Sequence, residues 1–202
     1  MTAPGPRQKR PSRGRPVATT HAEIEQAAFR LFAERGFEAT TLEDIAREVG
    51  VSRRTLFGYF DSKNDIPWGQ FDRTLESFRA LLEAMPEDLP LHEAVFQGIV
   101  GFNEFPGDAE PPHLDRMRLI LQTPALQAHS VLRYREWRQV ISEYVARRLA
   151  VDPGDLLPQT VGHVSLALAL TAYERWLSDP DSTVPQLLAE TREALGDFLE
   201  RF

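Results

Sequence analysis

Two adjacent arginines stand at the beginning of a short predicted helix, where they could donate hydrogen bonds to the edges of DNA bases. Arg53 and Arg54 follow Ser52, whose side chain can cap the helix. An arginine in the first turn of such a helix can donate two hydrogen bonds to O6 and N7 of guanine, which favours that base by about 1–3 kcal/mol. The spacing therefore predicts a helix that enters the major groove and reads sequence.

A second predicted helix and a glycine turn come before the arginines and would hold them in place. Thr41 can cap this helix, and Gly50 can adopt the left-handed conformation that ends it. Apolar residues between them recur at helical spacing, namely Leu42, Ile45, Ala46 and Val49. The pattern predicts a helix-turn-helix in which Leu56 and Phe57 point inward. An ordinary helical hairpin is the alternative, but packing alone does not explain two arginines behind a capping serine.

One further helix comes first and completes a predicted three-helix head. Thr20 and Glu23 have the spacing of a capping box, and Gly36 marks the end of the helix. We therefore expect a DNA-binding domain over residues 19–66. Residues 1–66 carry 11 Lys and Arg against 9 Asp and Glu, although the whole chain has a net charge of −7. The basic charge thus lies where DNA would bind, and the acidic remainder would be repelled by it.

Residues 1–18 have the composition of a disordered basic arm, with prolines and glycines and no acidic residue. Its predicted DNA-contacting cations are Arg7, Arg10, Arg13 and Arg15. The arm can remain a solvated tail, or it can place arginines in a minor groove next to the major-groove site. No apolar stretch follows the charges, so the segment does not resemble a signal peptide.

The remaining sequence predicts an effector-binding and dimerisation domain over residues 67–202. Helical periodicity recurs and no strand alternation is sustained, so the expected fold class is all-α. Prolines and glycines separate predicted helices at residues 62–83, 91–105, 112–122, 124–149, 158–177 and 185–202. The first of these would connect the head to the body. The sequence has no cysteine and no apolar run of about 18 residues, so we expect a cytoplasmic protein without disulfides or a membrane span.

The helix-turn-helix resembles the DNA-binding domain of the TetR family of bacterial transcriptional regulators. The matching residues are Phe32, Gly36, Phe37, Ala39, Thr40, Thr41, Ile45, Ala46, Gly50, Val51, Ser52, Thr55, Leu56, Phe57, Tyr59, Phe60, Ser62 and Lys63. The resemblance implies contacts to double-stranded DNA through Arg53 and Arg54, and to its phosphates and sugars through Thr41, Ser52, Thr55, Tyr59 and Lys63. Pro67 departs from the family pattern, because it deletes a backbone hydrogen bond early in the next predicted helix and can bend it.

The family resemblance also implies a homodimer, in which the last two helices of each chain form a four-helix interface. Both predicted helices carry more apolar surface than a surface hairpin needs, and the candidate interface residues are Leu168, Tyr173, Trp176, Leu195 and Phe198. A two-fold dimer can bind two half-sites of an operator that lie about 34–36 Å apart. A monomeric core hairpin is the alternative.

In this family the middle helices would enclose an effector pocket. The candidate pocket residues are Phe96, Phe102, Phe105, Arg116, Met117, Leu121, His129, Arg133, Trp137 and Ile141. Each of them singly is also explained as core or as solvated surface. Together with Arg118 they predict a pocket for a hydrophobic small-molecule effector, and an acyl compound with a polar or anionic head is one candidate.

Three segments resemble a narrower group within the TetR family, the regulators associated with gene clusters for the peptide-derived redox cofactor mycofactocin. The segments are residues 66–71, 117–130 and 156–163. With the head, this resemblance covers nearly all of the chain past Pro16, and it includes the unusual Pro67. It implies control of mycofactocin-related or neighbouring redox genes.

An enzyme and a helical small-molecule carrier are the two alternative classes of protein. An enzyme would need a catalytic constellation, and the sequence has no glycine-rich phosphate loop, no zinc-binding His-Glu-x-x-His helix and no serine nucleophile elbow. A helical small-molecule carrier would have no use for a helix-turn-helix. We therefore expect a regulator with no catalytic residue, no metal site and no cofactor, and binding to double-stranded DNA separates these classes.

Overall fold

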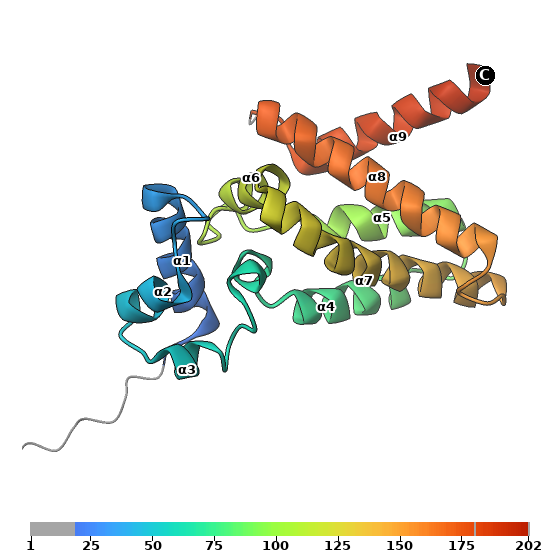
Figure 1. Cartoon of the computed structure of the whole chain (residues 1–202). Coiled ribbons are helices and arrows are strands. Elements are labelled where there is room, and N and C mark those ends of the chain that lie inside the picture. The colour runs from blue at the N-terminus through green and yellow to red at the C-terminus, as the bar shows by residue number, and fades with distance from the viewer. Residues whose placement is uncertain (1–18, 180, 202) are drawn as a thin grey trace, which may run out of the picture.

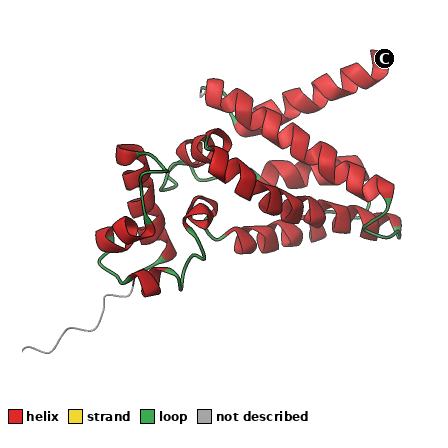
Figure 2. Ribbon diagram, in the orientation of Figure 1, coloured by secondary structure: helices red, strands yellow, loops and turns green. Residues whose placement is uncertain are grey.

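The computed structural model describes residues 19–179 and 181–201, and within these ranges the chain is helical and has no strand (Figures 1 and 2). The all-α prediction is therefore confirmed. The helices are α1 (His21–Arg35), α2 (Leu42–Glu48), α3 (Arg53–Leu56), the 3-10 helix η1 (Lys63–Trp68), α4 (Phe71–Glu83), α5 (Leu91–Phe102), α6 (His113–Gln122), α7 (Pro124–Leu149), α8 (Leu156–Ser178) and α9 (Val184–Arg201). The predicted basic arm lies outside the described residues.

Helices α1 to α3 form a head whose ends follow the predicted capping rules. Thr20 and Glu23 make the predicted capping box at α1, and Thr41 caps α2 in the same way. Gly50 has a φ of 72°, the left-handed conformation expected in the turn. The buried cluster of the head also contains Leu126, from the first turn of α7. The head is therefore packed onto the body as well as linked to it by the chain.

The prediction of one continuous helix over residues 62–83 is wrong. The chain forms η1, turns at Gly69 and begins α4 at Phe71. Pro67 lies inside η1 and has no N–H to donate, and Gly69 has a φ of 58°, which interrupts right-handed helical backbone. Figure 1 shows η1 as a separate coil between α3 and α4. The head and the body are thus connected through a segment with a sharp turn, which we call the joint (residues 67–70).

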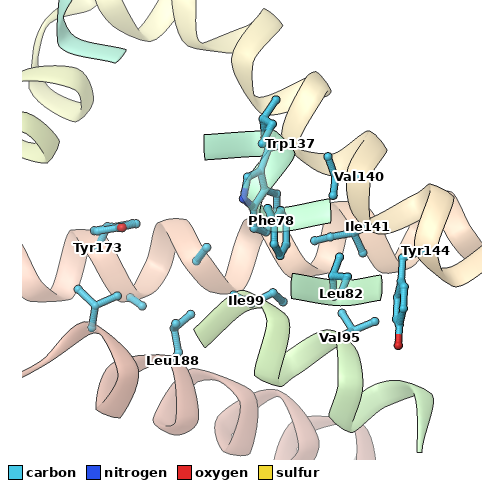
Figure 3. Packing of buried hydrophobic residues seen from close by; sticks show 14 of the residues in the cluster. Phe78, Leu82, Val95, Ile99, Trp137, Val140, Ile141, Tyr144, Tyr173 and Leu188 are labelled. Carbon is cyan, nitrogen blue, oxygen red and sulfur yellow. The ribbon is translucent and has the colours of Figure 1, made fainter. Parts of the chain in front are cut away.

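Helices α4 to α8 surround the core of the body. Figure 3 shows Phe78 and Leu82 of α4 near Trp137 and Ile141 of α7, with Ile99 of α5 beside them. The rings of Phe78 and Trp137 are stacked, with their centres 5.6 Å apart. Aromatic stacking and aliphatic contacts therefore hold α4 and α7 together directly after the joint.

Helix α9 is anchored on the body by its first half only. Val184, Leu187 and Leu188 are buried in the body core. The residues from 189 onward are exposed or half-buried, and Figure 1 shows the end of α9 extending past the other helices. The second half of α9 therefore has little of this chain to pack against.

Candidate functional site

The two predicted base-reading arginines have different surroundings. Arg53 forms an ion pair with Glu43 of α2, and its guanidinium lies 5.3 Å from the ring centre of Phe57. Arg54 is exposed, and it has no ion-pair partner among residues 19–179 and 181–201. Arg54 can therefore reach a base without breaking a contact within the protein, whereas Arg53 would first have to leave Glu43.

The prediction for Leu56 is confirmed, and the prediction that Phe57 points inward is wrong. Leu56 is fully buried, whereas Phe57 is 41% exposed. Neighbouring residues on a helix point in directions about 100° apart, so only one of the two can face a narrow core. Phe60, four residues after Leu56, lies on the same face and fills the core instead.

Two of the predicted phosphate-contacting hydroxyls, those of Thr41 and Ser52, act as helix caps. Thr41 Oγ1 accepts a hydrogen bond from the backbone N–H of Asp44 at 3.2 Å. Ser52 Oγ accepts one from the backbone N–H of Thr55 at 3.0 Å, and the two hydroxyl oxygens are 2.8 Å apart. Thr41, Ser52 and Thr55 are all exposed, so a phosphate can reach their hydroxyls while Thr41 caps α2 and Ser52 caps α3.

Two other predicted phosphate contacts also hold the head together, which sequence reasoning missed. The hydroxyl of Tyr59 donates to the carbonyl of Thr19 at 2.6 Å. The ammonium of Lys63 donates to the carbonyls of Phe37 and Thr40 at 2.7 and 2.9 Å, and it lies 4.3 Å from the ring centre of Phe37. Removing Lys63 would therefore loosen the turn between α1 and α2 as well as remove a positive charge.

The body contains a cavity of about 330 Å³ next to the joint. Its wall combines the joint and η1 with Glu25 of α1, with α4, with the end of α5 and the segment that follows it, and with helices α6, α7 and α8. The larger apolar and aromatic lining residues are Trp68, Phe71, Phe102, Phe105, Met117, Ile120, Tyr134, Trp137, Leu166 and Leu170. A space of this size and lining suits a small apolar ligand.

Half of the predicted pocket residues lie in this wall, and half do not. Those that line the cavity are Phe102, Phe105, Arg116, Met117 and Trp137. Ile141 does not line the cavity and is fully buried in the core, and Leu121 packs beside that core. Phe96 also lies outside the cavity wall, and its ring centre is 4.5 Å from the guanidinium of Arg192 in α9.

His129 and Arg133 do not line the cavity either, and both contact η1. Asp65 accepts hydrogen bonds from His129 Nε2 at 2.9 Å and from Arg133 Nη2 at 3.1 Å. Burial raises the pKa of Asp65, but hydrogen bonds from Ser62 and Arg133 and the interaction with His129 outweigh it, so this pKa is lowered. These two side chains therefore hold η1 against α7.

Sequence reasoning missed the contribution of the joint to the cavity. Trp68, Gly69 and Gln70 all line it. The available signal was the segment at residues 66–71, in which Pro67 interrupts the helical pattern. A tryptophan between a proline and a glycine can leave the helical register and face a cavity.

Tyr173 belongs to a chain of hydrogen bonds in the cavity wall. Its hydroxyl donates to Oδ1 of Asn103 at 2.6 Å, so Nε2 of His113, 2.9 Å away, must donate to it. Burial and the nearby Arg116 lower the pKa of His113 to about 4, so the imidazole is neutral near pH 7. Tyr173, one of the residues predicted for the dimer interface, is buried within the single chain. Trp176 is half-buried beside it.

One arginine connects the cavity wall to the head. Arg116 of α6 donates from Nη2 to Oε2 of Glu25 in α1 at 2.6 Å, and from Nη1 to the carbonyl of Pro67 at 2.5 Å. Its side chain is 19% exposed and that of Glu25 is 10% exposed, so water screens the pair weakly. We call these two contacts the Arg116 link. Through it, one residue of the cavity wall holds both α1 and the joint.

Helices α8 and α9 present apolar side chains to the outside. Val164, Phe198 and Leu199 are 39%, 56% and 68% exposed. The predicted interface residues Leu168 and Leu195 are half-buried. The two helices therefore carry an outer apolar surface, which we call the α8–α9 surface.

Both the head and the body match families of known proteins. Residues 24–66 match the family model described as bacterial regulatory proteins of the tetR family. Residues 89–200, more than half of the chain, match the model described as the MftR C-terminal domain. The chain belongs to the TetR family. The family resemblance predicted from the helix-turn-helix is confirmed, and so is the resemblance to the mycofactocin-associated group.

Individual TetR-family proteins resemble the chain over most of its length. A protein of Mycobacterium tuberculosis named as a mycofactocin biosynthesis transcriptional regulator, MftR, is 42% identical over 93% of this chain and 95% of its own. The transcriptional regulator TcmR of Streptomyces glaucescens is 29% identical over 91% of this chain and 84% of its own. The crystal structure of Thermus thermophilus FadR, a TetR-family repressor in complex with lauroyl-CoA, has the same fold. It superposes with a TM-score of 0.56, at 24% identity, over 87% of this chain and 93% of that one.

The chain is thus a TetR-family transcriptional regulator, and its relatives are regulators rather than enzymes. Among the described residues, no group of three or more His, Asp or Glu side chains is arranged to hold a metal ion. None of the helices that the structure describes is long and apolar enough to cross a membrane.

Proposed function

We propose that this TetR-family chain is a ligand-responsive repressor that binds a palindromic operator as a homodimer. Its target genes would be mycofactocin-related or neighbouring redox genes, as the name of the M. tuberculosis relative suggests. The observation that carries the proposal is the Arg116 link, because it joins the wall of a ligand-sized cavity to the first helix of the DNA-binding head. A carrier without DNA binding would gain nothing from such a connection.

In the complex with DNA, Arg54 reads bases from the major groove and Arg53 joins it after leaving Glu43. The hydroxyls of Thr41, Ser52 and Thr55 contact phosphates from the ends of α2 and α3. The arginines of the N-terminal arm enter the neighbouring minor groove. These roles are supported by the exposure of Arg54 and of the three hydroxyl-bearing residues.

Dimerisation would take place through the α8–α9 surface. Phe198 and Leu199 are exposed in the half of α9 that extends past the body, and contiguous apolar surface of this kind is typical of an interface. A second copy is the occupant that a two-fold operator requires, since each head reads one half-site. Leu168 and Leu195 would lie at the contact between the four helices.

An apolar effector would enter the body cavity and release the operator. The T. thermophilus FadR structure is a complex with lauroyl-CoA, which makes an acyl compound a reasonable candidate. A ligand that packs against Trp68 and Gly69 displaces the joint, and with it the Arg116 link and α1. Release follows only if the ligand binds more tightly to a conformation whose two heads no longer match the half-sites.

Selection of operator fragments tests this proposal. The purified protein is mixed with sheared genomic DNA, and the fragments that it retains are sequenced. We expect a palindrome with half-sites one helical turn apart, near mycofactocin-related genes. The variant Arg54→Ala serves as a matched control and should enrich the same palindrome more weakly. Retention of fragments without a shared motif by the unaltered protein would contradict the proposal.

A further inference from the structure

One aromatic side chain at the end of α3 has no role in the core of the head. Phe57 is 41% exposed, whereas Leu56 before it is fully buried and Phe60 after it is 4% exposed. Phe57 belongs neither to the buried cluster of the head nor to the partly buried residues packed against that cluster. The core of the head is therefore complete without this ring, which stays available to a molecule outside the chain.

Phe57 lies beside the two arginines that are proposed to read bases. Its backbone keeps right-handed helical angles, and it follows Arg54 by three residues and Arg53 by four. Residues at these spacings are neighbours on a helix surface, with Cβ atoms about 5–6 Å apart. The guanidinium of Arg53 indeed lies 5.3 Å from the centre of the Phe57 ring. Base pairs are about 3.4 Å apart along DNA, so a helix that brings these arginines to base edges brings the ring to within about two base pairs of them.

A phenyl ring in the major groove finds one apolar group on the base edges. All four bases present hydrogen-bond donors or acceptors there, and thymine adds the methyl group on its C5 atom. Because the ring has no polar atom, covering a donor or acceptor would remove its water and offer no hydrogen bond in return. Contact with a thymine methyl group instead removes apolar surface from water on both sides. The ring therefore favours thymine over the other bases.

We propose that Phe57 is a specificity-determining residue whose ring packs against the methyl group of a thymine, within about two base pairs of the guanine that Arg53 or Arg54 binds. The inference rests on the proposed entry of α3 into the major groove, and it adds a base that is recognised without a hydrogen bond. Each half-site then combines a guanine, read by hydrogen bonds, with a nearby thymine, read by its methyl group.

Replacement of single thymines by deoxyuridine in the selected operator tests the inference. Deoxyuridine pairs with adenine as thymine does and lacks only the methyl group. Binding of the full-length protein to each altered operator is measured by titration at one fixed salt concentration. We expect replacement at one position of each half-site to weaken binding about three- to fivefold per half-site, as the loss of one buried methyl group would. The remaining thymines are internal controls and should tolerate the replacement.

The variant Phe57→Ala removes the ring. For that operator position, the ratio of thymine affinity to deoxyuridine affinity should fall to about one, and Phe57→Leu, which keeps an apolar side chain, should retain most of the ratio. Because the ratio is formed within each variant, changes in folding or in overall affinity affect both operators and cancel. Leu132→Ala is the matched control, since Leu132 is 52% exposed on α7, and its ratio should equal that of the unaltered protein.

The inference is overturned if no deoxyuridine replacement weakens binding, because Phe57 then contacts no methyl group. An unchanged ratio in Phe57→Ala would overturn it as well, since another side chain would then recognise the thymine. Failure of the proposed function looks different, because deoxyuridine would then weaken binding as expected while no effector changed operator affinity.

Discussion

In the head, the side chains available to DNA lie on the surface at helix ends, whereas in the body the side chains available to a ligand line a cavity enclosed by several helices. The exposed position of Arg54 depends on a cap and a glycine turn within a few residues of it. The position of Trp137 depends on contacts with α4 and α5, which are far away in sequence. Substitutions of exposed side chains in the head should therefore change DNA recognition with little effect on stability, whereas substitutions of side chains buried in the body should lower stability.

Disrupting the α8–α9 surface should have the largest effect on function. Leu168→Glu and Phe198→Glu place a charge in the proposed contact between two copies, so we expect monomers whose operator affinity falls by about a thousandfold or more. Light scattering gives the oligomeric state, and a DNA-binding titration gives the affinity. Val131→Glu is the control, because Val131 is 64% exposed on α7 and undergoes the same chemical change. Dimers that still bind the operator after both substitutions would place the interface elsewhere.

Breaking the Arg116 link should be the most destabilising single change in the connection between head and body. Arg116→Met leaves the carboxylate of Glu25 largely buried and unpaired, which should lower the free energy of unfolding by up to about 3 kcal/mol. Arg118→Met, on the same helix, removes an exposed pair with Asp115 and should change it by less than about 1 kcal/mol. Denaturant unfolding measures both. Equal losses in the two variants would show that the Arg116 link has no special role in stability.

Arg54→Ala tests whether an exposed side chain of the head recognises DNA bases without contributing to stability. We expect the preference for operator over random DNA to fall by about 1–3 kcal/mol, because the arginine contacts base edges. The free energy of unfolding should change by no more than about 0.5 kcal/mol, since the side chain is exposed. Arg79→Ala, an equal change of charge on α4, should leave the preference intact. A loss of affinity that is the same for operator and random DNA would assign Arg54 to the phosphates.

The smallest expected effect is the pH dependence of stability that His113 of the body causes. The pKa of His113 is lowered from 6.5 to about 4, so between these values the unfolded chain binds a proton that the folded chain does not. Stability is therefore retained above pH 6.5 and declines as the pH falls toward 4. Between pH 7 and pH 5 we expect His113 to account for a loss of about 1–2 kcal/mol, which His113→Gln should remove. His92→Gln, at a side chain that is 71% exposed, is the matched control.

Local rules made the head predictable from sequence, and long-range packing made the cavity harder to predict. The caps at Thr20 and Thr41 and the turn at Gly50 involve groups within four residues of one another, so residue types settle them. The error at Phe57 was also local, because only one of two neighbouring side chains could face the core.

In the body, helical periodicity showed which side chains face inward but not what they meet there. Ile141 and Trp137 both face inward, yet Ile141 is packed within the core, whereas Trp137 also lines the cavity. Sequence reasoning assigned Tyr173 to an outer surface. It could not show the hydrogen bonds to Asn103 and His113, because these residues are distant in sequence. Likewise, apolar spacing continued through the joint, and only Pro67 indicated that the helix would break there.

In the proposed function, a ligand in the body cavity controls the DNA affinity of the head. Titration of a preformed operator complex with long-chain acyl compounds tests it most directly, if DNA release and tryptophan fluorescence are recorded together. We expect operator affinity to fall about 5- to 150-fold as the fluorescence of Trp68 and Trp137 reports occupation of the cavity. Fluorescence changes that report full occupation while operator affinity stays constant would contradict it.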